Sequence, residues 1–401
     1  MTDENRQKRI LKLGVIGLGR AFTLMLPTFT ADRRVKLCAA ADPRPEARAL
    51  FTSDFGPAYE TVEQLCANPE VEAIYVSSPH QMHAEHVQTA AKAGKHVLVE
   101  KPMAITIEQC DSMIDAARKA GTYLIVGHSH SFNRPIQRLR ELIQGGEFGA
   151  VRMISALNYT DFLYRPRRPE ELVTEQGGGV VFSQAAHQID IVRLIGGGLV
   201  KSVSAATGSW DPARPTEGAY SALFSFESGA FASATYSGFG HFDSDELMGG
   251  IDEMGQKKEP GRYGATRRAL CSAANSDVEA SLKSARNYGG TGYEPPAPIT
   301  GLQHQHFGFV VVSCEKADLR PLPSGVMIYA DETQRLDPLL PPHIPRSEVL
   351  DELYEAAANG KPPLHSGEWA RATLEACLAI LRSAQDGRTI ILKHQVSAAA
   401  D

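Results

Sequence analysis

The chain has 401 residues, which is more than one hydrophobic core usually holds, so we expect two domains. Hydrophobic residues make up 43% and charged residues 22%, a composition typical of globular proteins and not of fibrous or disordered chains. The formal net charge of -6 argues against a nucleic-acid partner, because binding to phosphates needs a clustered excess of Lys and Arg.

The cysteines and the N-terminal segment indicate a cellular location. All 6 cysteines occur singly and none forms a C-x-x-C pair, so neither a zinc site nor a redox motif is indicated. The first residues, MTDENRQKRI, are polar and charged, and no apolar run approaches membrane-spanning length. We therefore expect a cytoplasmic protein with free thiols and with no secretory signal, membrane segment or bound metal.

Short apolar runs alternate with helical periodicity from Leu11 onward. Strands are predicted at 11–19, 35–42, 71–78, 95–100 and 122–127, and helices at 61–69, 83–94 and 106–121. Such alternation is typical of parallel strands linked by crossover helices. The sequence therefore predicts an N-terminal Rossmann domain over residues 1–133, a doubly wound α/β unit with a parallel sheet.

After Gly127 strands dominate, with long irregular inserts between them. We expect a second domain over residues 134–401, of α+β type with a large, open, mostly antiparallel sheet. It begins with a helix at 135–146 and a strand at 151–160, and it ends with a helix at about 366–386 and a strand at 388–393. We expect the helix at about 366–386 to pack back on the first domain. The segment 241–298 predicts only one helix, around 278–285, and is an insert or an oligomer arm.

A glycine-rich turn lies between the first strand and the following helix. Gly17 allows the tight turn, and Gly19 lets the backbone approach a pyrophosphate at the helix N-terminus, while Phe22 stands where a third small residue is usual. Asp42 ends the second strand, where an acid holds the ribose hydroxyls and repels a 2'-phosphate. This favours NAD, although Arg44 keeps NADP open because it could pair with that phosphate or lie over adenine. The predicted contacts in this region are Gly17, Gly19, Arg20, Ala21, Asp42 and Arg44.

Lys101 follows a strand that runs from His96 to Val99, at the sheet edge where ligands bind in open α/β folds. A lysine that is partly desolvated beside a nicotinamide cation loses its proton more readily, so Lys101 could act as a base or donate a hydrogen bond to a reacting hydroxyl. The alternative interpretation is a solvated surface lysine.

Several segments together resemble one enzyme family, the Gfo/Idh/MocA oxidoreductases, over nearly the whole chain. They are GVIGLGRA, SSPHQMHAEHV, AGKHVLVEKP, FNRP and GGGVVFSQAAHQID. The resemblance implies NAD(P)-dependent oxidation and catalytic roles for Lys101 and His187. In the family's motif G-G-G-x-x-x-D-x-x-x-H the Asp is replaced here by Ser183. A carboxylate that would polarise the histidine or bind a substrate hydroxyl is therefore missing, which suggests a substrate unlike a typical polyol.

The resemblance also assigns further site residues. It places Ser78, His80, His83 and Glu100 at the cofactor, with His83 near the nicotinamide ribose, and His128, His130, Asn133 and Ser183 at the substrate. His128 and His130 form an H-x-H pair at the end of a strand, which could indicate a metal. No third ligand lies within sequence reach, so hydrogen-bonding histidines are the preferred interpretation.

A basic and aromatic loop, DFLYRPRRP, precedes the glycine triplet and contains Arg165, Arg167 and Arg168. Guanidinium groups pair bidentately with carboxylates, which suits an acidic substrate with a flat ring; the alternative is a solvated loop paired with Glu170 and Glu171. This loop and the segment 306–332 resemble the cis-dihydrodiol dehydrogenases of phthalate breakdown, the phthalate 4,5-cis-dihydrodiol type. That branch implies a cyclohexadiene diol with ring carboxylates, oxidised by hydride transfer to NAD and then converted to a catechol.

The resulting hypothesis is that Lys101, with His187, removes the hydroxyl proton as hydride departs, while an arginine of the basic loop binds a carboxylate. Three alternatives stay open: a sugar or polyol dehydrogenase, an NAD-dependent glycosidase, and a dinucleotide-sensing protein without catalysis, which ranks last because Lys101 and His187 are present. An open sheet with an apolar face must be covered, so we expect a homodimer or homotetramer formed through the second domain.

Overall fold

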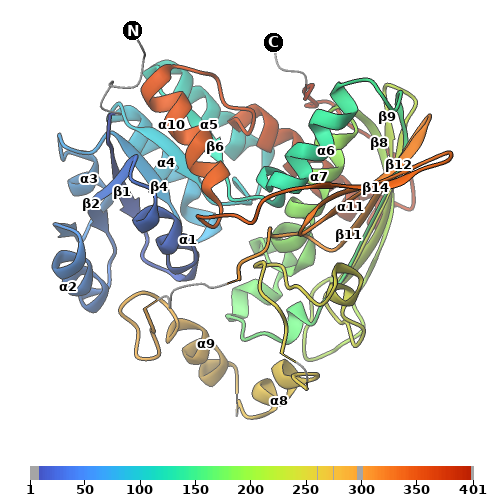
Figure 1. Cartoon of the computed structure of the whole chain (residues 1–401). Coiled ribbons are helices and arrows are strands. Elements are labelled where there is room, and N and C mark those ends of the chain that lie inside the picture. Colours follow the sequence, from blue (N-terminus) through green and yellow to red (C-terminus); the bar gives the residue numbers. More distant parts are fainter. Residues whose placement is uncertain (1–8, 260, 274, 296–300, 399–401) are drawn as a thin grey trace, which may run out of the picture.

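The computed structural model describes residues 9–259, 261–273, 275–295 and 301–398. These residues form a six-stranded sheet and a nine-stranded sheet, and helices α6, α7 and α11 lie between the two (Figure 1). Among the described helices, none combines the length and apolar character needed to cross a bilayer.

The first sheet is parallel throughout, with strand order β3-β2-β1-β4-β5-β6. Its strands are β1 (Leu11–Ile16), β2 (Val35–Ala41), β3 (Ala58–Tyr59), β4 (Ala73–Val76), β5 (His96–Val99) and β6 (Leu124–Val126). The predicted strands are all present, and β3 is additional because two residues are too short to give a sequence pattern. Nearly all residues of these strands are buried, as expected of a parallel sheet covered on both faces.

Helices cover both faces of this sheet, which confirms the predicted Rossmann architecture. They are α1 (Arg20–Ala31), α2 (Pro45–Asp54), α3 (Val62–Cys66), α4 (His83–Lys92) and α5 (Ile107–Ala120). Local signals fix their ends: in α5 the Thr106 hydroxyl accepts from the Gln109 amide, and Gly121 ends the helix in the left-handed region.

The strand order reverses direction next to β1. The chain runs outward from β1 to β2 and β3 and then returns to β4 on the other side of β1. The carboxyl ends of β1 and β4 therefore diverge into loops with a crevice between them, the usual ligand position in open α/β sheets. Gly17 follows β1, Ser77 follows β4 and Lys101 follows β5 at this edge.

The second sheet has the order β14-β13-β12-β11-β7-β10-β9-β8-β15 and is antiparallel except for the pair β7 and β10. Its strands are β7 (Val151–Tyr159), β8 (Val200–Gly208), β9 (Ala219–Phe226), β10 (Phe231–Ser237), β11 (Phe309–Cys314), β12 (Ala317–Leu322), β13 (Gly325–Ala330), β14 (Gln334–Pro338) and β15 (Ile390–Ile391). Buried and exposed residues alternate along β10, so one face packs on helices and the other is open. The predicted open, mostly antiparallel sheet is confirmed.

The helices of the later chain join the two sheets. They are α6 (Arg134–Gln144), α7 (Ala186–Ile195), α8 (Ala265–Cys271), α9 (Ser276–Ser284), α10 (Ser347–Asn359) and α11 (Gly367–Asp386). Helix α11 contacts β8 and α7 on one side and α5 of the first domain on the other. Helix α10 is buried in the first core through Val349, Leu350 and Leu353. The sequence did not indicate this return of α10 to the first domain.

The segment 241–298 contains the predicted helix, as α9, and also α8, which lacks a regular apolar spacing. Both helices lie below α1 and α2 in Figure 1. Tyr288, just after α9, is 0% exposed and packs edge-on against Phe22 with ring centroids 5.2 Å apart. The segment therefore docks on the first domain.

Candidate active site

A cavity of about 620 Å³ lies at the carboxyl edge of the first sheet, within the size range of small-ligand and cofactor pockets. Most of the predicted cofactor residues line it: Gly17, Gly19, Arg20, Ala21, Asp42, Arg44, Ser78 and His80. The lining residues that the sequence did not single out include His86 on α4, and Lys283, Ser284 and Asn287 in the 241–298 segment. That segment gave no periodic signal that would place it at the cavity.

The glycine-rich turn leaves room for a pyrophosphate. Gly17 has φ +88°, and a Cβ there would lie 2.9 Å from the Ser78 amide nitrogen. Gly19 caps the N-terminus of α1, and a Cβ there would find no heavy atom closer than 4.0 Å. The first backbone N–H groups of α1 are thus open to the cavity, so these residues fit a dinucleotide pyrophosphate.

Asp42 is 5% exposed and organises the loop around the cavity. Its carboxylate accepts hydrogen bonds from the Leu18 amide at 2.7 Å and the Arg44 amide at 2.9 Å. The Arg44 guanidinium pairs with the same carboxylate at 3.0 Å and donates to the Leu18 carbonyl at 2.8 Å. Arg44 is therefore held by the protein itself, with Asp42 as its counter-ion.

His83 does not lie where the resemblance placed it. Its side chain is 0% exposed, and both ring nitrogens face backbone carbonyls, Nδ1 that of Pro102 at 3.1 Å and Nε2 that of Ser78 at 3.0 Å. Burial lowers the pKa of His83 to about 4. The prediction of direct cofactor contact is thus corrected: His83 ties the loop after β4 to the loop after β5.

Glu100 is also engaged within the protein. Its carboxylate accepts a hydrogen bond of 2.5 Å from the Tyr75 hydroxyl on β4. Burial raises the pKa of Glu100, while the hydrogen bond from Tyr75 and the positive charges of Lys101 and Arg346 oppose that rise. Glu100 therefore supplies negative charge beneath Lys101.

Lys101 is half-buried, and its Nζ donates a 2.8 Å hydrogen bond to the carbonyl of Ser183, in the helical turn that carries the glycine triplet motif. Burial lowers the pKa of Lys101 to about 8, and the charges of Arg346 and Arg167 act in the same direction, against those of Glu100 and Glu253. A lysine with this pKa has an appreciable neutral fraction near physiological pH and can accept a proton.

Three histidines gather beside Lys101. The ring centroid of His187 is 4.7 Å from that of His130 and 6.5 Å from that of His128. Burial holds the pKa of His187 well below its ordinary value, the charge of Lys101 adds to this, and the buried Nδ1 of His187 has no hydrogen-bond partner in the described part of the chain. His187 is therefore neutral, and its unpaired Nδ1 is enclosed by the protein.

The H-x-H pair is not on a strand, because β6 ends at Val126. His128 lies in the loop after β6, His130 begins a 3₁₀ turn, and Asn133 bridges them, with His128 Nε2 at 3.1 Å and His130 Nδ1 at 2.8 Å. Within the described residues, no group of three or more His, Cys, Asp or Glu side chains could hold a metal ion. The pair is thus hydrogen-bonded through an amide.

The arginines of the basic loop occupy different places. Arg168 lines the dinucleotide cavity and pairs with Glu170 and Glu171 at 3.2 and 3.6 Å. Arg165 has a side chain that is 44% exposed and pairs with Asp161 at 3.3 Å. Arg167 stacks on Phe162 with its guanidinium carbon 3.6 Å from the ring centroid, and its buried Nε has no hydrogen-bond partner among the described residues.

Two charged residues of the site come from parts of the chain that gave no sequence signal. Arg346, just before α10, is the one non-glycine residue with positive φ in the described backbone, at 55°, and its charge acts on Lys101, His128 and His187. Glu253 is 18% exposed and acts on Lys101 with the opposite sign. Neither residue has a motif around it that could have revealed its role.

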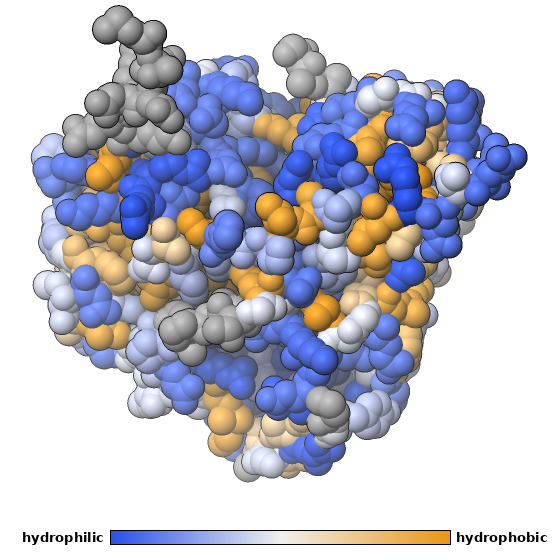
Figure 2. All heavy atoms as spheres, in the orientation of Figure 1, coloured by the Kyte–Doolittle hydropathy of each residue, from blue (hydrophilic) through white to orange (hydrophobic). Residues whose placement is uncertain are grey.

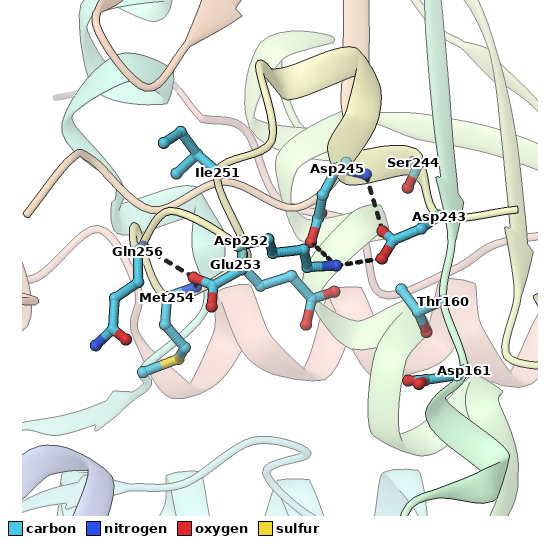
Figure 3. A network of polar contacts seen from close by, with 12 residues as sticks. Thr160, Asp161, Asp243, Ser244, Asp245, Ile251, Asp252, Glu253, Met254 and Gln256 are labelled. Carbon is cyan, nitrogen blue, oxygen red and sulfur yellow. Dashed lines mark hydrogen bonds and ion pairs between the residues drawn. The ribbon is translucent and has the colours of Figure 1, made fainter. Parts of the chain in front are cut away.

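Glu253 extends from the 251–256 turn toward the end of β7, where Thr160 and Asp161 lie (Figure 3). Its Oε1 accepts from Asn158 at 3.2 Å, and its Oε2 lies 3.9 Å from Arg165. The turn itself is held by Asp252, whose Oδ1 accepts from the backbone amides of Met254 and Gln256, each at 2.9 Å. This network fixes a second carboxylate whose charge acts on Lys101.

Two family descriptions match the chain: an oxidoreductase family with an NAD-binding Rossmann fold over residues 11–128, and a GFO/IDH/MocA C-terminal domain over residues 136–248. The chain belongs to the Gfo/Idh/MocA oxidoreductase family. The predictions of an oxidoreductase with an NAD-binding domain are thereby confirmed.

Individual relatives are consistent with this membership. The chain is 50% identical over 373 residues to the 1-carboxy-3-chloro-3,4-dihydroxycyclohexa-1,5-diene dehydrogenase of Comamonas testosteroni, covering 92% of this chain and 94% of the relative. A crystal structure from Bordetella bronchiseptica RB50 has a TM-score of 0.89 at 39% identity, covering 96% of this chain and 100% of that one. The myo-inositol 2-dehydrogenase of Thermotoga maritima is 29% identical over 197 residues, covering 49% of this chain and 58% of the relative. The resemblance to the dihydrodiol dehydrogenase type is confirmed by the first of these.

Proposed function

We propose that this member of the family oxidises a carboxylated cyclohexadiene cis-diol to a catechol, with NAD as the electron acceptor. The observation that carries the proposal is the 50% identity, over 92% of the chain, to a dehydrogenase of a carboxylated dihydroxycyclohexadiene. The charges around Lys101 are mixed, with Glu100 and Glu253 beside Arg346 and Arg167, and the two arginines are the groups that suit an acidic substrate.

The residues divide the reaction between them. The bound dinucleotide supplies the hydride acceptor. Lys101, in its neutral form, takes the proton of the reacting hydroxyl, and His187 holds that hydroxyl through its neutral imidazole. Arg167, whose Nε has no partner, binds the ring carboxylate. Ser183 contributes its backbone carbonyl, which accepts from Lys101 Nζ and orients it.

The preference for NAD over NADP rests on Asp42. Its carboxylate stands at the cavity wall, where it repels a 2'-phosphate. An unpaired arginine at this position would attract that phosphate. The charge of Arg44 is neutralised by its ion pair with Asp42.

We also propose a homodimer or homotetramer that forms through the open face of the nine-stranded sheet. Met153 and Phe231 are register partners on this face, and both are exposed, as is Leu223 on the neighbouring strand. On the side shown in Figure 2, by contrast, hydrophobic residues are scattered among hydrophilic ones. A cytoplasmic location is proposed because the cysteines are free thiols, as is usual in that compartment.

The test is NADH formation by the purified protein, with the 1-carboxy cis-dihydrodiol offered beside inositols and aldoses, and NAD compared with NADP. Turnover of the dihydrodiol to a catechol supports the proposal. Turnover of polyols alone would replace it with a sugar or polyol dehydrogenase, and product release without net NADH would indicate a glycosidase. Lys101→Met should abolish turnover and leave NAD binding nearly unchanged, whereas retained turnover would remove Lys101 from the chemistry.

The carboxylate contact has its own test. Arg167→Gln should raise KM for the carboxylated diol by about tenfold or more, the loss expected for a hydrogen bond to a charged group. The same substitution should leave KM for the diol without a carboxylate nearly unchanged. Arg165→Gln is the matched control, because Arg165 is exposed and already paired with Asp161. Equal effects of Arg167→Gln on both substrates would contradict the assignment.

A further inference from the structure

A continuous set of hydrogen bonds leads from helix α7 toward the surface helix α10. It begins at Asp190 on α7, which is 4% exposed. Asp190 Oδ2 accepts from the hydroxyls of Ser129, at 2.6 Å, and Ser131. Asp190 Oδ1 accepts from Trp369 Nε1 at 2.6 Å and from the Thr373 hydroxyl at 2.9 Å, which fixes the carboxylate in place.

The path continues through a buried histidine. Ser131 Oγ lies 2.8 Å from His365 Nε2, and His365 Nδ1 lies 2.6 Å from Glu352 Oε1 on α10. Ser131 and His365 are each 0% exposed, and the ring of Phe132 stacks on that of His365 with centroids 3.5 Å apart. The Glu352 side chain is 22% exposed, so the path ends at solvent.

The inner end of the path meets Lys101. A cavity of about 30 Å³ is lined by Lys101, Ser129 and Asp190, with apolar side chains around them. This volume is large enough for one water molecule, and the lining is mainly apolar apart from a few residues, among them Lys101, Ser129 and Asp190, which can bind that water. One bridging water would therefore connect Lys101 to Ser129 and Asp190.

We propose that Ser129, Ser131, His365 and Glu352, anchored by Asp190, form a relay that carries the proton released at Lys101 to solvent. The inference rests on the proposed oxidation of an alcohol, which releases one proton in the site for each hydride transferred. Between Ser129 and Glu352 every group both accepts and donates a proton, and the links are hydrogen bonds that the structure contains, while the step from Lys101 to Ser129 runs through the bridging water.

The protons balance over one turnover. The hydroxyl proton passes to Lys101 and then, through the water, to Ser129, while the proton held between His365 and Glu352 leaves to solvent. The Ser131 hydroxyl turns from Asp190 to His365 Nε2 and gives it a proton, and the Ser129 hydroxyl turns from Asp190 to Ser131, 3.1 Å away, and replaces that proton. Rotation of the two hydroxyls restores the starting arrangement, so one proton enters and one leaves.

The relay is needed only while substrate and dinucleotide occupy the cleft. Lys101 is half-buried in the protein alone, and substrate and dinucleotide must both lie against it during hydride transfer. They then cover its direct route to solvent. A proton path through the protein, from Ser129 to Glu352, lets Lys101 return to its neutral form before product leaves.

The test is Glu352→Gln, which keeps the size of the side chain and its hydrogen-bonding oxygen but cannot accept the proton. For whichever alcohol the protein oxidises, kcat should fall by about tenfold or more, with KM and NAD affinity nearly unchanged, since a positioned proton transfer contributes that much or more. The solvent deuterium isotope effect on kcat should rise because proton release becomes rate-limiting. Glu355→Gln, on the same helix, is the matched control and should match the wild type.

A second variant separates the relay from a structural role. In Glu352→Ala, formate or acetate should restore kcat by replacing the missing carboxylate at His365. Loss of kcat without a raised isotope effect and without rescue would mean that Glu352 only stabilises the fold, and wild-type kcat in Glu352→Gln would overturn the relay directly.

A readout without substrate keeps failure of the relay distinct from failure of the proposed function. The relay predicts that the ring N–H protons of His365, followed by NMR, exchange with solvent faster in the wild type than in Glu352→Gln. Equal exchange rates would overturn the relay whether or not an alcohol is oxidised. Absence of NADH formation with all alcohols, by contrast, counts against the proposed function.

Discussion

Lys101 owes its chemistry to its sequence neighbour Glu100 and to charges that come from three distant parts of the chain. Arg167 and Arg346 lower its pKa, and Glu100 and Glu253 raise it, while burial contributes the largest lowering and sets the result at about 8. Because 1 pKa unit corresponds to about 1.4 kcal/mol, changing one of these neighbours alters the proton affinity of Lys101 measurably.

This balance predicts the pH dependence of the oxidation. The neutral form of Lys101 is the base, so kcat/KM should rise with pH through an apparent pKa near 8. Glu253→Gln removes a negative charge and should lower the apparent pKa of this rise in kcat/KM. Arg167→Gln removes a positive charge and should increase that apparent pKa. The measurement is kcat/KM against pH for the three proteins, and shifts in the same direction would contradict the model.

Asp42 is the second residue whose role follows from its charge. Asp42→Asn keeps an oxygen that accepts from the Leu18 amide but releases Arg44 from its ion pair. The ratio of kcat/KM for NADP to that for NAD should therefore rise by about tenfold or more, which corresponds to about 1.4 kcal/mol. Adding Arg44→Gln should reverse the gain, and an unchanged ratio in Asp42→Asn would show that Asp42 does not select the cofactor.

At the scale of elements, the segment that contains α9 completes the dinucleotide cavity from outside the Rossmann domain. Lys283, Ser284 and Asn287 line the cavity, and Tyr288 holds them there by packing between Phe22 on α1 and Phe51 on α2. Figure 1 shows α8 and α9 below α1 and α2. Cofactor affinity should therefore depend on the docking of this segment.

Tyr288→Ala tests that dependence. Loss of the buried ring should lower the free energy of unfolding by about 3 kcal/mol, as for other large aromatic truncations. It should also raise the Kd for NAD by about tenfold, because the lining residues lose their support. Tyr288→Phe keeps the ring and should preserve the Kd while losing the hydrogen bond to Asp54. Thermal unfolding and NAD titration measure the two effects, and an unchanged Kd in Tyr288→Ala would separate α9 from the cofactor.

At the scale of the whole molecule, the nine-stranded sheet has one covered and one open face. The open face carries Met153, Leu223, Phe231, Tyr329 and Leu336, all at least 36% exposed. Apolar side chains gathered on one regular surface are typical of self-association.

Light scattering on charge variants tests this surface. The double variant Leu223→Glu, Phe231→Glu buries two charges in any sheet-to-sheet interface and should be a monomer at concentrations where the wild type is a dimer or tetramer. Ile10→Glu adds a charge at an exposed residue of the first domain, and it should leave the oligomer intact. A double variant with the wild-type mass would place the interface elsewhere.

The sequence by itself determined the features that depend on residues close together in the chain. The apolar runs of β1, β2, β4 and β5, the turn at Gly17 and Gly19, and the position of Lys101 after a strand could all be predicted, because period and turn chemistry act over a few residues. Family motifs added His187, while chain length and the change of pattern after Gly127 indicated two domains.

Tertiary structure decided which charges meet. Arg346 and Glu253 reach Lys101 from segments without periodicity or motif, and Arg168 and Arg167, neighbours in sequence, lie at different places because the loop turns between them. His83 matched the family motif, yet the folded loops enclose both of its ring nitrogens. A local sequence pattern specifies the backbone of each element. The pKa of a side chain and the hydrogen-bonding atoms that it has left unpaired depend instead on all the groups packed around it, and only the folded chain brings those groups together.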